Sequence, residues 1–222
     1  MHAPLLRGLR RSVAVVAVGA ATACAPAPAP ESGPAPAAAD TAHQHHAPAS
    51  AQAADSVSAD VRFLQHMIPH HAQALAMTAL VPSRTTRTDV RMIAERITVS
   101  QRDEIATMQR WLEARGAAVP PVDTADAVRA AARHAGMAGM LTPDQLNQLA
   151  AARGPEFDRL FLTYMIQHHR GAVTMVAELL SAGGAQEPQL FGIASEVESD
   201  QLMEIARMER ILATMPSASP DR

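Results

Sequence analysis

The stretch FLQHMIPHHAQALAM at residues 63–77 returns as FLTYMIQHHRGAVTM at residues 161–175. The two stretches align at a constant offset of 98 (165 minus 67). Each copy carries two consecutive histidines, three and four residues after a methionine. The matched positions are Phe63 with Phe161, Met67 with Met165, His70-His71 with His168-His169, and Met77 with Met175. Imidazole and thioether groups together suit a soft or borderline metal ion, so this repeat is the main clue to function.

The repeat continues into the segment that follows each stretch. Matched residues there share an offset of 100 (208 minus 108): Gln101 with Gln201, Glu104 with Glu204, Ile105 with Ile205, and Met108 with Met208. Apolar residues recur at spacings of three and four, which is typical of amphipathic helices. Two similar helical hairpins bury one shared core when they pack about a pseudo-twofold axis. The sequence therefore predicts an all-α four-helix bundle built from two repeated hairpins.

The composition supports packed helices and argues against a nucleic-acid partner. Hydrophobic residues make up 48% of the 222 residues, but aromatic residues only 3%. An aliphatic, methionine-filled core suits helices better than a β-sandwich. With 19 basic and 22 acidic residues, and no basic run after residue 11, the chain lacks the positive patch of a nucleic-acid-binding protein.

Residues 1–24 have the pattern of an export signal. Three arginines precede the apolar residues 12–23, and Ala21-Thr22-Ala23 is an A-x-A-type cleavage site. The one cysteine, Cys24, follows at once, as in a bacterial lipoprotein signal whose cysteine is lipid-modified. We therefore expect an exported protein, periplasmic or anchored to a membrane through Cys24 and facing the extracytoplasmic side.

The rest of the chain divides by composition into a tether, a folded part and a tail. Residues 25–56 alternate Ala and Pro and are expected to form a disordered tether, in which three histidines (His43, His45, His46) are either metal donors or a solvated patch. The folded part is expected at residues 57–216, with hairpins at 57–116 and 155–216 and a connector at 117–154. Residues 217–222 are expected to be a disordered tail.

Helix boundaries follow from capping residues, glycines and prolines. Pro82-Ser83 predicts the end of the first helix, and Thr142-Pro143 predicts a short helix in the connector. The long helices are expected at about residues 58–80, 88–115, 155–182 and 188–215.

The candidate metal ligands fall into two ranks. The first rank is the doubled motif: Met67, His70, His71, Met165, His168 and His169. The second rank comprises nearby donors on the same helices, on the partner helices and in the connector: His66, Met77, Met175, Glu104, Met108, Glu204, Met208, His134, Met137 and Met140. Methionine at helical spacing is usually core filler, but consecutive histidine side chains diverge by about 100° and do not both fit one apolar stripe. The doubled pair therefore favours a metal site.

These residues carry a resemblance to a known family. The two motifs, together with Gly139-Met140-Leu141-Thr142 and Phe157-Asp158-Arg159-Leu160-Phe161, resemble the ferritin-like family catalogued as domain of unknown function 305. The likeness spans about residues 58–215. The family includes periplasmic copper-binding proteins, so the resemblance implies a ferritin-like bundle that binds copper through the first-rank methionines and histidines, with Met137 and Met140 as accessory ligands.

The preferred hypothesis is a non-enzymatic protein that sequesters or passes on copper as Cu(I), with Cu(II) or Ag(I) as alternatives. A second hypothesis is a lipoprotein interaction module in which the motif-bearing faces form a homodimer. A third is a di-iron or di-manganese oxidase, which needs a Glu-x-x-His pair on each of two helices. Glu104 and Glu204 are followed three residues later by Thr107 and Arg207, so the sequence disfavours the third hypothesis.

Overall fold

The computed structural model describes residues 49–216. Every regular element in that range is an α-helix, which confirms the all-α fold. The four long helices are α1 (Ala49–Arg84), α2 (Thr88–Glu113), α5 (Gly154–Ser181) and α6 (Pro188–Ala213), and two short helices, α3 (Ala127–Arg133) and α4 (Pro143–Ala151), lie between them. The predicted export signal, Cys24, the tail and the tether up to residue 48 lie outside the described residues.

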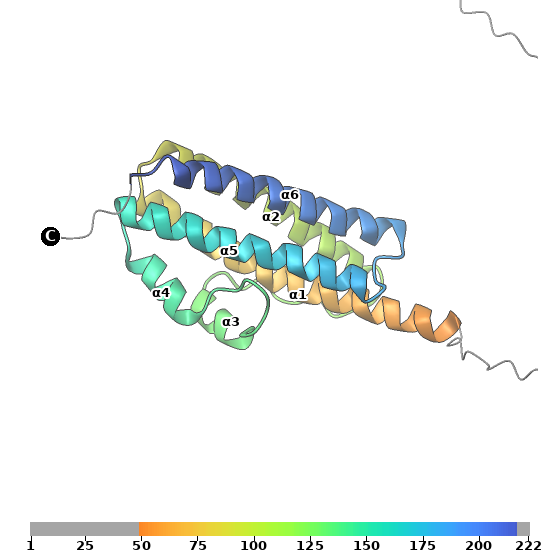
Figure 1. The fold of residues 1–222 in the computed structure, drawn as a ribbon. Coiled ribbons are helices and arrows are strands. Elements are labelled where there is room, and N and C mark those ends of the chain that lie inside the picture. Colours follow the sequence, from red (N-terminus) through yellow and green to blue (C-terminus); the bar gives the residue numbers. More distant parts are fainter. Residues whose placement is uncertain (1–48, 217–222) are drawn as a thin grey trace, which may run out of the picture. The chain divides into compact units, whose positions relative to one another are not determined.

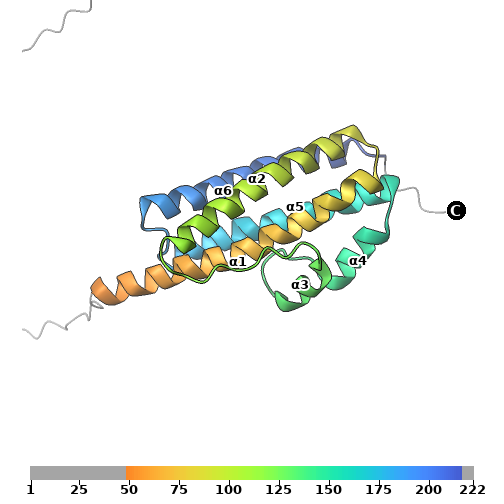
Figure 2. The same cartoon turned by 180° about the vertical axis from the view of Figure 1, so that it is seen from behind.

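The long helices pair as the repeat predicts. Helices α1 and α2 form one hairpin, and α5 and α6 form the other (Figure 1). Helix α1 also packs against α5, and α2 against α6, so each long helix contacts two others. The short helices α3 and α4 lie outside the bundle on the α1 side (Figure 2). In residues 49–216, no helix is long and apolar enough to cross a membrane.

The observed helix ends follow the local chemistry. Thr142 caps α4 in a capping box with Gln145, and Pro143 occupies the first turn, as predicted. Helix α1 differs at both ends: it begins at Ala49, inside the expected tether, and it continues past Pro82 to Arg84. Pro82 lacks an N–H to donate within the helix, but Thr85 N still donates to Val81 O at 3.2 Å. Pro82 alone therefore does not stop the helix.

The bundle interior consists of two apolar clusters with polar residues between them. One cluster lies at the end that holds the C-terminal half of α1 and includes Met77, Ile97, Phe161, Met165 and Met208. The other lies at the opposite end and includes Met67, Met108, Trp111, Met175 and Leu190. Between them lie the buried residues that we call the polar layer: His70, His71, Gln101, Glu104, His168, His169, Gln201 and Glu204. Each long helix contributes two of these residues.

Candidate metal centre

All four motif histidines are fully buried in the polar layer. The two rings of each pair do not share one apolar stripe, as expected, although both are buried. Each ring of a pair contacts a different neighbour instead. His70 faces the equivalent residue of the other hairpin, His168, with ring centroids 3.8 Å apart. His71 and His169 instead face α2 and α6, where each meets a glutamate.

The Nε2 atom of each histidine is fixed by a protein oxygen. His70 Nε2 lies 3.0 Å from the carbonyl oxygen of Ala138 in the connector. His168 Nε2 lies 2.9 Å from the carbonyl oxygen of His70. A carbonyl oxygen only accepts hydrogen bonds, so both Nε2 atoms carry the hydrogen and donate.

The other two histidines are oriented by carboxylates. His169 Nε2 donates to Glu204 Oε2 at 2.8 Å, and His71 Nε2 donates to Glu104 Oε2. All four residues of these two histidine–glutamate contacts are buried. The glutamates, which were second-rank ligand candidates, therefore orient the imidazoles of the polar layer.

Burial keeps two of the imidazoles neutral. It lowers the pKa of His70 to about 3, and the neighbouring His71 adds to this effect. Burial, assisted by His70, also lowers the pKa of His168 well below its ordinary value. Because both rings are neutral and their hydrogens are on Nε2, their Nδ1 atoms carry free lone pairs.

The Nδ1 atom of every motif histidine is buried and has no hydrogen-bond partner among the described residues. Such orphaned polar atoms are uncommon in folded proteins and require an explanation. A histidine that binds a metal through one nitrogen almost always donates its other N–H to a carboxylate or a backbone carbonyl. The polar layer has that arrangement four times, so its donor chemistry fits a metal ion.

Two glutamines of the polar layer are also unpaired. Gln101 and Gln201 are fully buried, and neither amide oxygen nor amide nitrogen has a partner in the described part of the chain. Oε1 of Glu104 is in the same state. Gln101 and Gln201 match each other in the sequence, but neither was among the predicted ligand candidates. The repeat could have identified both glutamines, because a polar residue that is matched between two otherwise apolar helix faces indicates a buried polar position.

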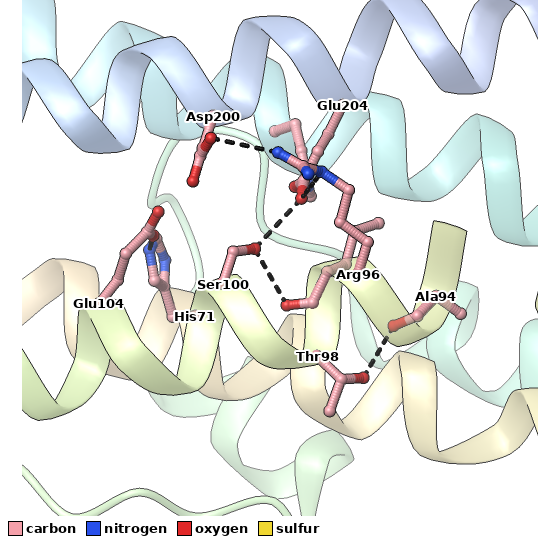
Figure 3. Close-up of polar contacts among 10 residues, drawn as sticks. His71, Ala94, Arg96, Thr98, Ser100, Glu104, Asp200 and Glu204 are labelled. Carbon is pink, nitrogen blue, oxygen red and sulfur yellow. Dashed lines mark hydrogen bonds and ion pairs between the residues drawn. The ribbon is translucent and has the colours of Figure 1, made fainter. Parts of the chain in front are cut away.

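The α2–α6 face of the layer is asymmetric (Figure 3). On one side, Glu204 Oε1 accepts a 3.1 Å hydrogen bond from Ser100 and lies 3.5 Å from Arg96 Nε. Arg96 also lies 3.4 Å from Asp200. The residues equivalent to Arg96 and Ser100 are Glu196 and Asp200, so Glu104 has no matching cation or hydroxyl. Burial, with the charges of Glu104 and Glu204, raises the pKa of Asp200.

The connector covers the opposite, α1–α5 face of the layer. Gln73 holds it by two hydrogen bonds with the backbone of Leu141, of 2.8 and 3.2 Å. Gly139 and Gly171 let the backbones approach closely: a Cβ on Gly171 would stand 2.1 Å from the carbonyl oxygen of Ala138. That oxygen is the partner of His70, so the connector contacts the α1 histidine directly.

The remaining candidates are distributed over three places. Four methionines pack into the apolar clusters near the layer: Met67, Met108, Met165 and Met208. Met77 packs deeper in one apolar cluster, and Met140 is a buried residue of the connector itself. Four further donors line a surface cleft of about 600 Å³ instead: His66, His134, Met137 and Met175. The structure thus separates His66 from the motif histidines with which the sequence had grouped it.

In residues 49–216, no three His, Cys, Asp or Glu side chains are arranged to hold a metal ion. The histidines and glutamates of the layer therefore form no preformed site of three such ligands. Within each motif the ring centroids lie 6.3 Å apart (His70 and His71) and 6.1 Å apart (His168 and His169). With metal–nitrogen bonds of about 2 Å, these separations are compatible with one ion held between the two rings. Imidazole and thioether donors suit Cu(I) or Ag(I).

The fold and the layer define an all-helical bundle with a buried histidine–glutamate core. The chain belongs to the family described as domain of unknown function (DUF305), whose model matches residues 60–212. This confirms the resemblance seen in the sequence. Comparison with the curated proteins finds no significant match.

Several solved structures are similar to this chain. A DUF305 fragment from Deinococcus radiodurans is 33% identical, with a TM-score of 0.60, over 70% of this chain and 95% of that one. A putative secreted DUF305 protein from Streptomyces coelicolor is 27% identical, with a TM-score of 0.62, over 76% and 98%. CopM in its Cu(II)-bound form is 26% identical, with a TM-score of 0.56, over 69% and 95%. CopM is also known in Cu(I)-bound and silver-bound forms.

Proposed function

We propose that this protein binds copper as Cu(I) in the polar layer and sequesters the ion or passes it on. The observation that carries the proposal is the set of four buried Nδ1 atoms without partners, on imidazoles whose Nε2–H groups are already fixed. The imidazoles of His70 and His168, which are neutral and have free Nδ1 lone pairs, are ready to bind a metal without first losing a proton. The similarity to CopM, which binds Cu(I), Cu(II) and silver, supports the choice of metal.

The ion is cargo in this proposal, held and released without catalytic turnover. Met67 and Met165 stand one helical turn before their histidine pairs and would add thioether donors. The predicted export signal and lipid attachment at Cys24 would place the protein on the extracytoplasmic side. The Streptomyces relative, described as a putative secreted protein, supports that location.

Competition with a Cu(I) chelator of known affinity tests this proposal. The wild-type protein should take Cu(I) from the chelator, and the His70/His71/His168/His169→Ala variant should lose the binding assigned to the layer. Circular dichroism checks that the variant is folded. Because four cavities in the core are costly, the Met67→Leu/Met165→Leu variant is a second, milder test, and it should weaken binding while the fold is kept. Unchanged Cu(I) affinity in both folded variants would reject the proposal.

Thermal unfolding gives an independent measure. A ligand that binds the folded protein alone raises its unfolding temperature with ligand concentration. We expect Ag(I), used as a redox-inert substitute, to raise that temperature in the wild-type protein and to raise it much less in the methionine variant. An equal rise in both would remove Met67 and Met165 from the ligand set.

A further inference from the structure

The surface cleft contains donors that the polar layer does not use. His66 and Phe63 of α1, His134 and Met137 of the connector, and Met175 and Glu178 of α5 line its wall. Its volume is about 600 Å³. His66 is exposed, His134 and Met137 are half-buried, and Met175 is buried. The cleft therefore presents two imidazoles and two thioethers from three elements, with access from solvent.

The two imidazoles of the cleft differ from those of the layer because no hydrogen bond to another described residue fixes them. Within the described residues, neither His66 nor His134 has a hydrogen-bond partner in the protein, so both nitrogens of each ring are available. Both rings line the same cleft, His66 from α1 and His134 from the connector. Met137 follows His134 in a tight turn, with Met137 N donating to His134 O at 3.2 Å.

Both arginines that line the cleft, Arg62 and Arg133, interact with other groups of the protein. Arg133 forms an ion pair with Asp123 at 3.1 Å, and Arg62 is also held by an interaction within the protein. Glu178 adds a negative charge to the wall. The ion pair of Arg133 and the carboxylate of Glu178 therefore reduce the net positive charge of the cleft wall.

From these observations, we propose that His66, His134, Met137 and Met175 form a second Cu(I) site, separate from the polar layer and open to solvent. Two nitrogen and two thioether donors select a soft ion such as Cu(I) or Ag(I) over Zn(II) or Mg(II). The site adjoins the layer, since Ala138 lines the cleft and its carbonyl oxygen binds His70. The cleft is thus placed to receive an ion before the buried histidines do. Binding at the cleft does not depend on the proposed function of the layer.

The pseudo-twofold repeat supplies a built-in control. At the position equivalent to His66 the second copy has Tyr164, and the residue equivalent to Met175 is Met77. Met77 lines a different pocket, beside Leu80 and Leu146, in which no histidine takes part. Substitution of Met77 therefore tests the loss of a buried methionine without the loss of a cleft donor.

The test is a titration of the full-length protein with Ag(I), followed through its methionine methyl groups by NMR. The 12 methionines are assigned through Met→Leu variants. We expect the methyl signals of Met137 and Met175 to shift on binding. The His66→Gln/His134→Gln variant should abolish these shifts. In a chelator competition it should also bind one equivalent of Cu(I) fewer, or bind that equivalent much more weakly. The loss of affinity should exceed the roughly 10–100-fold that loss of an outer-shell partner costs. Met175→Leu should weaken the same equivalent, and Met77→Leu should not.

Methyl signals of Met137 and Met175 that do not move at saturating Ag(I) would overturn the cleft site. So would a His66→Gln/His134→Gln variant with unchanged Cu(I) stoichiometry and affinity. The methyl signals of Met67 and Met165 report separately on binding in the polar layer. Shifts confined to Met137 and Met175 would support the cleft and contradict the proposed function of the layer, and shifts confined to Met67 and Met165 would do the reverse.

Discussion

The two histidine–glutamate pairs of the polar layer have equivalent residues and different surroundings. His169 and Glu204 are backed by Ser100 and Arg96, so the carboxylate of Glu204 is shared among three partners. Oε1 of Glu104 has no partner among the described residues. The α1 pair therefore retains more uncompensated negative charge and should attract a cation more strongly. Two copies of one motif can thus differ in their affinity for a cation because of residues outside the motif, here Arg96 and Ser100.

The largest expected effect is acid unfolding, which involves both histidine pairs. Between pH 6.5 and about 3, the unfolded chain binds a proton at residue 70 that the folded protein excludes. The free energy of unfolding should therefore fall as the pH drops through this range, by up to about 1.4 kcal/mol per pH unit for each such imidazole. His168 acts in the same direction. Urea unfolding at pH 7, 5.5 and 4.5 measures the slope.

Buried carboxyls oppose this trend. Burial raises the pKa values of Asp60 and Asp158, so their protonation favours the folded state at low pH. We expect the histidines to dominate because their burial is complete. Stability that stays constant between pH 7 and 4.5 would contradict the neutral state of His70 and His168.

Removal of each glutamate tests the difference between the pairs. Glu204→Ala leaves His169, Ser100 and Arg96 without their shared acceptor and should cost about 3–5 kcal/mol of unfolding free energy, as for other broken buried ion pairs. Glu104→Ala leaves only His71 unpaired and should cost about 1–3 kcal/mol. Urea unfolding of both variants at pH 7 gives the comparison. Equal losses would mean that Arg96 and Ser100 do not distinguish the two pairs.

Gly171→Ala tests the contact between the connector and the α1 histidine. The new Cβ would overlap the carbonyl oxygen of Ala138, so the connector must shift, at a cost of about 1–3 kcal/mol typical of overpacking. Gly192→Ala is the matched control, because that helical glycine has open space around it and should gain up to about 1 kcal/mol in helix propensity. Thermal unfolding compares the two, and a stabilised Gly171→Ala variant would refute the close packing.

The smallest effect is expected at Arg96. Its side chain is 43% exposed, so solvent screens its charge and its influence on Glu204 should stay below about 1 kcal/mol. Arg96→Gln should raise the Cu(I) affinity of the α5 pair, His168 and His169, by less than about fivefold. Chelator competition measures this affinity. Glu196→Gln, at the equivalent position of α6, is the charge-changing control and should leave the α5 pair unchanged. A weaker α5 pair in Arg96→Gln would show that Arg96 mainly orients Glu204.

The architecture was predictable because the matched residues of the repeat align each helix of the first hairpin with its equivalent in the second. Residues 91–105 and 191–205 have the same pattern of burial, position by position, as their matched apolar residues indicate. Capping chemistry located the start of α4. The doubled motif also identified the four histidines of the layer.

The details of the site were not predictable, because they depend on contacts between distant segments. Helical spacing grouped His66 with His70, yet His66 lines the surface cleft together with His134 of the connector. No local pattern indicates that the carbonyl of Ala138 meets His70, or that Arg96 reaches across to α6. The role of the glutamates in orienting histidines also required the packing of α1 on α2 and of α5 on α6.

The contact between the His70 and His168 rings has a consequence for the order of loading. These equivalent residues meet with centroids 3.8 Å apart, so an ion bound to one ring lies within a few ångströms of the other in a poorly screened interior. The second ion would then bind against the charge of the first. We therefore expect negative cooperativity between the two histidine pairs, and two distinct binding steps even where the intrinsic affinities are equal.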